Sequence, residues 1–175
     1  MKNILAISGS LRQGSSNHSI LKFLGSIVPA DIEYTIYNDL AQIPAFDPGF
    51  DTDNPPASVA SLRQLLAKTD GLIICTPEYA FGVPGSLKNM LDWMVSSSTL
   101  VDKPVALITA SLGGEHAHAS LLLTLGALSA NIVDDATLLI QFVRSKIDAD
   151  GNVKDEETVK NLQKVSSSFL NKLTN

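Results

Sequence analysis

Cysteine is almost absent from this chain of 175 residues, which holds Cys75 alone. A single cysteine permits no internal disulfide, so we expect a protein of a reducing compartment, the cytoplasm. Positive charge is also scarce, because 13 Lys and Arg stand against 18 Asp and Glu, a net charge of −5. This acidic balance argues against nucleic acid and against an anionic membrane surface as partners.

Long hydrophobic runs are missing as well. The chain passes from Met1 and Lys2 into an apolar run at 4–7, which is too short for a signal sequence. The most apolar stretch, 121–140, is interrupted by Asn131 and two aspartates, well short of a membrane span. The remaining composition, 45% hydrophobic and 18% charged, is that of an ordinary globular protein. The length predicts one domain over residues 1–175.

Short apolar runs alternate with helical patterns along the chain, and the segment 38–56, rich in Pro, Asp and Asn, is predicted as a long surface loop. Strands are predicted at 4–7, 32–36, 71–75, 105–108 and 132–143, the last one divided around Asp134 and Asp135. Helices are predicted near 20–28, 59–66, 84–94, 121–128 and 155–169. This alternation predicts an α/β fold, a parallel sheet with helices on both faces. Ligands of such sheets bind beyond the carboxyl ends of the strands, where three unusual loops would meet.

The first of these loops, 8–17, has the composition of a phosphate-binding turn. It lies between a predicted strand and a predicted helix, so backbone N–H groups and the helix dipole would face an anion. Gly9 and Gly14 would let the chain turn tightly and approach a ligand closely. The plainer alternative is a turn with an N-cap, which needs no ligand. Arg12 would add a positive charge, and hydroxyl or amide donors come from Ser8, Ser10, Ser15, Ser16 and Asn17.

The loop matches neither of two well-known nucleotide motifs. Gly9 and Gly14 have the spacing of the nucleotide-triphosphatase loop, but Ser15 stands where that loop has lysine. The dinucleotide fingerprint needs two glycines where Ser8-Gly9-Ser10 has one. A thiol phosphatase is excluded because the loop holds no cysteine. A terminal monophosphate on a larger ligand is the class that remains.

The loops after the third and fourth predicted strands differ from the first in chemistry. In 76–85, Tyr79 and Phe81 offer ring faces, two prolines fix the backbone and Gly82 permits close approach, which suits a flat apolar ligand. Alternatively, these aromatics only plug the end of the core. Gly113 and Gly114 either present bare N–H groups to a polar ligand edge or merely turn the chain.

Together these residues resemble a known family. The likeness is carried by Ser8-Gly9-Ser10-Leu11-Arg12, the following Ser15-x-Asn17, Pro77-Glu78-Tyr79 and the run from Pro84 to Trp93. They look like the NADPH-dependent FMN reductases, flavodoxin-like proteins that include quinone, chromate and azo-dye reductases. The likeness covers nearly the whole chain and is strongest over residues 1–93. It implies the flavodoxin-like strand order 2-1-3-4-5.

The resemblance also implies a bound FMN, with NADPH or NADH as hydride donor and a small molecule as electron acceptor. The flavin would supply the chemistry, so no catalytic side chain is expected. Many members have Asn where this chain has Ala80, so a contact from that side chain is missing. The first loop would hold the phosphate through Ser10, Arg12, Ser15 and Asn17, with Ser8, Leu11 and Ser16 beside them. The ring would be lined by Pro77, Glu78, Tyr79, Ala80 and Gly82, and its other polar edge by Ser111, Gly113 and Gly114.

Other conspicuous residues have plainer interpretations. Cys75 ends a predicted buried strand and is interpreted as a small core residue. His116-x-His118 lacks a third ligand, so no metal site is predicted, although His116 is a candidate for the border of the substrate space. The segment 148–151 is predicted as a turn, because its glycine is two positions too early for a calcium loop. The polar face formed by Lys88, Asn89, Asp92 and Trp93 is interpreted as helix packing and subunit contact.

A homodimer or homotetramer is expected, because relatives of this kind are commonly dimers or tetramers. The third and fourth predicted helices also carry more apolar side chains than one inward stripe needs, namely Met90, Met94, Leu121, Leu122 and Leu123. Two other functions fit less well. A flavodoxin-like electron carrier would have a phosphate loop without Arg, and a non-redox protein would bind some other phosphate ester.

Overall fold

Five parallel strands form one sheet in the order β2-β1-β3-β4-β5, which confirms the predicted fold class and strand order. The structure is a computed structural model that describes residues 1–174. None of its helices, over these residues, is long and apolar enough to cross a membrane. The elements in chain order are β1 (Lys2–Ser8), α1 (Ser16–Ile27), β2 (Ile32–Tyr37), η1 (Leu40–Gln42), α2 (Ala57–Ala67), β3 (Gly71–Thr76), α3 (Gly85–Asp92), β4 (Pro104–Ala110), α4 (Glu115–Ala127), β5 (Asn131–Ile140), η2 (Val143–Lys146) and α5 (Glu156–Thr174), where η marks a short 3₁₀ helix.

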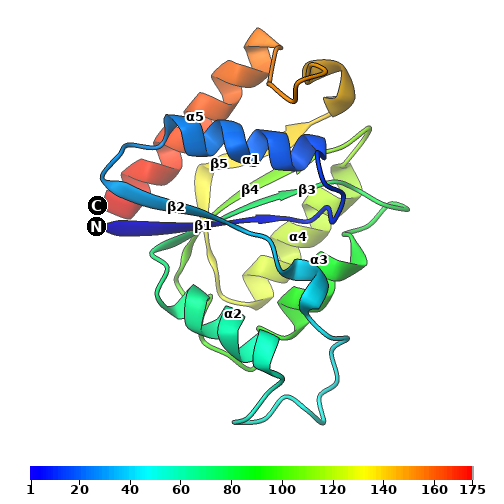
Figure 1. Cartoon of the computed structure of the whole chain (residues 1–175), viewed down its shortest axis with the longest axis vertical. Coiled ribbons are helices and arrows are strands. Elements are labelled where there is room, and N and C mark those ends of the chain that lie inside the picture. The colour runs from blue at the N-terminus through cyan, green and yellow to red at the C-terminus, as the bar shows by residue number, and fades with distance from the viewer. Residues whose placement is uncertain (175) are drawn as a thin grey trace.

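Helices cover both faces of the sheet, α1 and α5 on one side and α2, α3 and α4 on the other (Figure 1). Successive residues of a strand point to opposite faces. In β1, Ile4 and Ala6 therefore pack with α1 and α5, whereas Leu5 and Ile7 pack with the other three helices. All strands run toward the same edge, away from the two chain ends (Figure 1). The loops that leave the carboxyl ends of the strands consequently meet at that edge.

The fifth strand differs from the prediction at its middle and at its end. The pairing with β4 shifts between Val105↔Ile132 and Leu107↔Thr137, so the two aspartates at 134 and 135 form a bulge and not a break between two strands. The strand ends at Ile140, three residues before the predicted end. The reason is the left-handed backbone of Phe142, with φ 52°, which turns the chain into η2.

The segment 38–56, which was predicted as a long surface loop, is held against α3 by specific contacts. Asn89 of α3 accepts the N–H of Phe46 at 2.7 Å, and the indole N–H of Trp93 donates to the carbonyl of Pro44 at 2.8 Å. The rings of Trp93 and Phe46 also meet edge to face, with centroids 5.1 Å apart. The packing role predicted for Asn89 and Trp93 is confirmed.

The apolar surplus predicted for the third and fourth helices is mostly absent. Met90, Met94 and Leu121 are buried in the core under the sheet, and Leu122 packs partly against them. Only Leu123, which is 78% exposed, is left of that set at the surface. The prediction was wrong because α3 and α4 share one core with α2, and that core takes more side chains than one stripe.

Close packing of the first loop against β3 leaves no room for a side chain at Gly9. The N–H of Gly9 donates to the carbonyl of Cys75 at 2.9 Å. A Cβ on Gly9 would lie 2.1 Å from Oγ1 and 2.7 Å from Cβ of Thr76, a fully buried residue. The sequence suggested that Gly9 allows the chain to come close to a ligand. In the structure it instead allows the first loop to come close to β3. Gly14, by contrast, provides the turn, with φ 65°.

We predict that Gly9→Ala lowers the free energy of unfolding by about 1–3 kcal/mol, because the added methyl group overpacks a buried contact that has no flexible partner. Gly126→Ala is the matched control, since Gly126 lies exposed near the end of α4 with open space around its Cα. It should raise the free energy of unfolding by about 0.5–1 kcal/mol through helix propensity. Urea unfolding of the two variants and the parent measures both changes. Equal stability of Gly9→Ala and the parent would contradict the packing argument.

Candidate functional site

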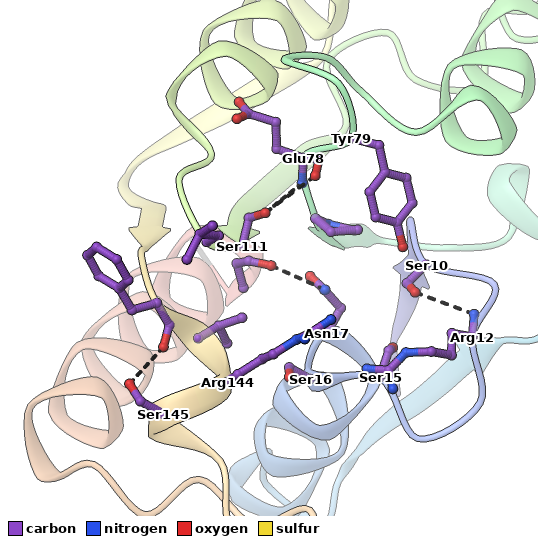
Figure 2. A pocket seen from close by; sticks show the side chains of 15 residues that line it. Ser10, Arg12, Ser15, Ser16, Asn17, Glu78, Tyr79, Ser111, Arg144 and Ser145 are labelled. Carbon is purple, nitrogen blue, oxygen red and sulfur yellow. Dashed lines mark hydrogen bonds between the residues drawn. The ribbon is translucent and has the colours of Figure 1, made fainter.

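Four segments at the carboxyl edge of the sheet enclose a cavity of about 510 Å³ (Figure 2). Three of them are the loops expected from the sequence, after β1, β3 and β4. The fourth is η2, which follows β5. Nine of the residues expected at the site line this cavity: Ser10, Arg12, Ser15, Ser16, Asn17, Pro77, Glu78, Tyr79 and Ser111.

The start of α1 forms one end of the cavity. Ser15 caps the helix, because its Oγ accepts the N–H of His18 at 3.2 Å and its carbonyl accepts that of Ser19 at 3.0 Å. No acceptor within residues 1–174 pairs with the N–H groups of Ser16 and Asn17. The N-cap is thus present, and it leaves two first-turn N–H groups and the positive end of the dipole for an anion.

Asn17 fastens this end of the cavity to the sheet. Its side chain is almost wholly buried, and its Nδ2 donates to the carbonyl of Ala110 at 3.2 Å. Its Oδ1 accepts a hydrogen bond from the thiol of Cys75, with 3.3 Å between oxygen and sulfur. Burial raises the pKa of the Cys75 thiol, so it remains a neutral donor, and its predicted place in the core is confirmed. The oxygen and one N–H of the Asn17 side-chain amide are therefore engaged within the protein, and its backbone N–H remains for a ligand.

Two arginines approach the start of α1 from different segments (Figure 2). Arg12 comes from the first loop, where its N–H lies 3.4 Å from Oγ of Ser10. Arg144 comes from η2 and extends toward Ser16 and Asn17. Neither guanidinium forms an ion pair with a carboxylate of the described residues. The end of the cavity at the start of α1 therefore carries two positive charges without a carboxylate partner among the described residues.

Ser8 and Leu11 lie outside this cavity and line a neighbouring hollow of about 360 Å³ on the far side of the first loop. Ser8 braces the loop, since its Oγ donates to the carbonyl of Ser10 at 3.1 Å and accepts the N–H of Ser10 at 3.2 Å. Ser8 therefore shapes the loop and does not contact the cavity.

The loop after β3 makes a tight turn, so that some of its residues line the cavity and others do not. The N–H and carbonyl groups of Tyr79 and Gly82 pair with each other at 3.0 Å in both directions. Ala80 and Phe81 between them have positive φ values of 49° and 58°. Ala80 and Gly82 consequently lie outside the cavity lining, while the ring of Tyr79 stands beside Ser10 at the cavity wall (Figure 2).

Glu78 joins the loops after β3 and β4. Its carboxylate accepts the N–H of Ala117 at 2.9 Å, in the first turn of α4, where the helix dipole favours a negative charge. Its own N–H donates to Oγ of Ser111 at 3.1 Å. The carboxylate points away from the cavity (Figure 2), so Glu78 presents its backbone there.

The two glycines after β4 do not line the cavity. Gly114 begins α4 with φ 120°, and a Cβ there would lie 2.8 Å from Cδ1 of Leu139.

Nearby, His116 and His118 point to different neighbours. His118 pairs through Nδ1 with Oγ1 of Thr109 at 2.9 Å, and burial lowers the pKa of its imidazole. His116 packs edge to face on the exposed Phe81, with ring centroids 5.2 Å apart.

Sequence reasoning missed one whole wall of the cavity. That wall comes from η2 and the end of the β4 loop, and comprises Leu112, Phe142, Val143, Arg144 and Ser145. Residues 142–145 were overlooked because the fifth strand was predicted to extend to residue 143, whereas Leu112 lies in the loop after β4 that was expected at the site. A usable signal was present, since Arg144 and Ser145 follow the last strand directly at the edge where ligands bind.

The cavity is cationic beside the start of α1, and Pro77, Tyr79, Leu112 and Phe142 contribute rings and aliphatic side chains to the rest of its lining. A flat ring with a phosphate tail matches this division. The size, about 510 Å³, also lies in the range of cofactor pockets. The residues present therefore fit FMN.

Comparison with known proteins agrees with this fit. The family model for NADPH-dependent FMN reductase matches residues 2–144. A quinone reductase from Escherichia coli K12 is 32% identical over 173 residues, which cover 95% of this chain and 92% of the relative. A 2-hydroxy-1,4-benzoquinone reductase from a Burkholderia species is 34% identical, over 91% of this chain and 90% of the relative.

Among solved structures, the flavoenzyme FerB, an NAD(P)H:(acceptor) oxidoreductase from Paracoccus denitrificans, superposes with a TM-score of 0.80 at 28% identity. The match covers 99% of this chain and 98% of FerB. Because the family model spans most of the chain and two relatives exceed 30% identity over nearly their whole length, the chain belongs to the NADPH-dependent FMN reductase family of oxidoreductases.

Proposed function

We propose that this protein uses bound FMN to transfer a hydride from NADPH or NADH to a small acceptor such as a quinone. The observation that carries the proposal is the divided cavity, with the start of α1 and Arg12 at one end and an apolar wall at the other. When bound, FMN supplies the redox chemistry, accepting a hydride at N5 and passing it on in a second half-reaction.

The phosphate would lie at the start of α1. The N–H groups of Ser16 and Asn17 would donate to it, as would the hydroxyl of Ser10, and the Arg12 guanidinium would pair with its charge. These groups sit on a loop that Gly9 and Asn17 fasten to β3 and β4. They are therefore positioned before a ligand arrives, which lowers the ordering cost of binding.

The flavin ring would lie against the apolar wall of Pro77, Tyr79, Leu112 and Phe142. Tyr79, Leu112 and Phe142 are all more than half exposed, so the wall is open on one side. An open side suits two substrates that take turns over the same ring. Glu78 is the one carboxylate of the lining, and it is bound to the start of α4. We therefore assign no protein acid or base to the reaction.

The names of the relatives support a quinone-like acceptor, since two of them are quinone reductases. An azoreductase from a Bacillus species, 30% identical over 78% of this chain, points to flat aromatic acceptors more broadly. A flat acceptor would stack over the flavin beside Tyr79 and Phe142.

We also propose a single domain over residues 1–175 and the cytoplasm as compartment, where the lone thiol of Cys75 stays reduced.

We expect the purified protein to show the visible spectrum of bound flavin, and anaerobic NADPH or NADH to bleach it. Bleaching follows because the donor would deliver a hydride to the ring in the cavity. Stopped-flow absorbance with each donor, then with a benzoquinone, measures the two half-reactions. FAD is the matched ligand control and should bind more weakly than FMN, since the cavity end suits a terminal monophosphate. A carrier without turnover would fail to oxidise the donor in a saturable way, and a non-redox protein would show no flavin spectrum.

Arg12→Ala should weaken FMN binding by roughly 10- to 150-fold, because hydrogen bonds to charged groups contribute about 1.5–3 kcal/mol and each 1.4 kcal/mol is tenfold. Riboflavin, which lacks the phosphate, should bind the variant and the parent alike. Fluorescence titration of the apoprotein with both ligands checks this. Equal losses for FMN and riboflavin would mean that Arg12 only braces the loop.

We further propose a homo-oligomer, most simply a twofold dimer. The exposed Leu123 of α4 and Phe81 in the loop after β3 are apolar side chains that a partner would cover. Light scattering at micromolar concentration should give twice the mass of the chain or a higher multiple. A fully active monomer would refute the proposal.

A further inference from the structure

The short helix η2 is held firmly against the loop that follows β4. The N–H of Val143 donates to the carbonyl of Ser111 at 3.0 Å, and that of Phe142 to the carbonyl of Leu112 at 3.1 Å. The N–H and hydroxyl of Ser145 both donate to the carbonyl of Phe142, at 3.0 and 2.8 Å. The left-handed backbone of Phe142 fixes the turn. The direction in which η2 presents its side chains is thus set by the backbone.

The two cationic side chains of η2, Arg144 and Lys146, have different surroundings. Lys146 pairs with the carboxylate of Asp155 at 3.3 Å, outside the cavity. Arg144 extends into the cavity toward the start of α1 (Figure 2). Within residues 1–174 no carboxylate lies in ion-pair distance of Arg144. A guanidinium aimed at a helix N-terminus without a carboxylate partner is repelled by the dipole, and an anion between them removes that repulsion.

A phosphate monoester has three oxygens that accept hydrogen bonds, more than one guanidinium fork can satisfy. At neutral pH it carries about −1.5 to −2. Arg12 contributes one positive charge, and the helix end contributes roughly half a charge. Arg12 and the helix end thus offset most of this charge, so a second guanidinium would act mainly by donating hydrogen bonds to the phosphate oxygens that Arg12 leaves unpaired. Arg144 is the remaining cationic side chain among the residues that line the cavity.

We propose that Arg144 is the second cation of the phosphate site and that it binds the FMN phosphate together with Arg12, an inference that rests on the proposed function. The phosphate is then held from two separate parts of the sheet, by the loop after the inner strand β1 and by the segment after the edge strand β5. Arg144 is a binding residue in this assignment and has no part in hydride transfer.

Arg144→Gln tests the assignment, because it removes the charge and keeps a side chain of similar reach. We expect about a tenfold weaker affinity for FMN, the lower end for a charged hydrogen bond, since Arg144 is exposed to solvent. Riboflavin affinity should stay within about twofold of the parent. Arg144→Lys should recover part of the loss, because it restores the charge without the planar fork. The ratio of riboflavin to FMN dissociation constants should fall further in the Arg12→Ala, Arg144→Gln double variant than in either single one.

Lys68→Ala is the matched control for net charge. Lys68 ends α2 at the opposite edge of the sheet and forms no ion pair within the described residues, so both affinities should be unchanged. Raised salt should weaken FMN binding more in the parent than in Arg144→Gln. These titrations use the apoprotein without NAD(P)H, so a protein that binds FMN in this way but does not turn over would refute the function and keep the assignment.

Three results would overturn the assignment of Arg144. Equal losses for FMN and riboflavin would mean that the substitution disturbs η2 as a structure. An unchanged FMN affinity with weaker binding of NADP⁺ to the FMN-loaded protein would place Arg144 on the phosphates of the nicotinamide donor. A parent protein that binds FMN and riboflavin equally would show that neither arginine holds a phosphate.

Discussion

The buried amide of Asn17 is the contact on which the site depends. It lies in the first turn of α1, it donates to the carbonyl of Ala110 at the end of β4, and it accepts from Cys75 in β3. One side chain thus fixes the positive end of a helix relative to two neighbouring strands, β3 and β4. Both partners are buried, so removing the amide would leave polar groups unpaired at a cost of about 1–3 kcal/mol. The position of the proposed anion site follows from this contact and from the packing of Gly9 on Thr76.

The fold was predictable because its strongest signals are local. Apolar runs in β1, β3 and β4 and helical spacing in α1, α2 and α5 can be recognised in short windows of the sequence, and their alternation implies the parallel sheet. The first loop was also recognisable, since Arg12 and the cluster of hydroxyl residues stand directly between a strand and a helix. The strand order came from the family likeness and not from the pattern alone.

What the sequence did not reveal depends on single backbone angles and on distant contacts. The wall formed by η2 exists because Phe142 takes a left-handed conformation, which is rare for a residue with a side chain. The amide of Asn17 was expected on the phosphate, but its partner Ala110 lies 93 residues away in sequence. Glu78 lines the cavity as expected, but the contact of its carboxylate with the first turn of α4, 39 residues further along the chain, was not foreseen. No short window of sequence contains such pairs.

The two ends of the cavity differ in rigidity as well as in polarity. The end at the start of α1, where we place the phosphate, is built from buried groups, such as Asn17 and Ser15, whose hydrogen bonds are already made within the protein. The ring end is built from Tyr79, Leu112 and Phe142, which are exposed and held mainly through their backbones. A cofactor that stays bound needs the first kind of surface, because its affinity comes from groups that are positioned in advance. Substrates that exchange at every turnover need the second kind, because an exposed apolar wall binds flat molecules weakly and releases them. The division of the cavity therefore matches the division between a retained cofactor and passing substrates.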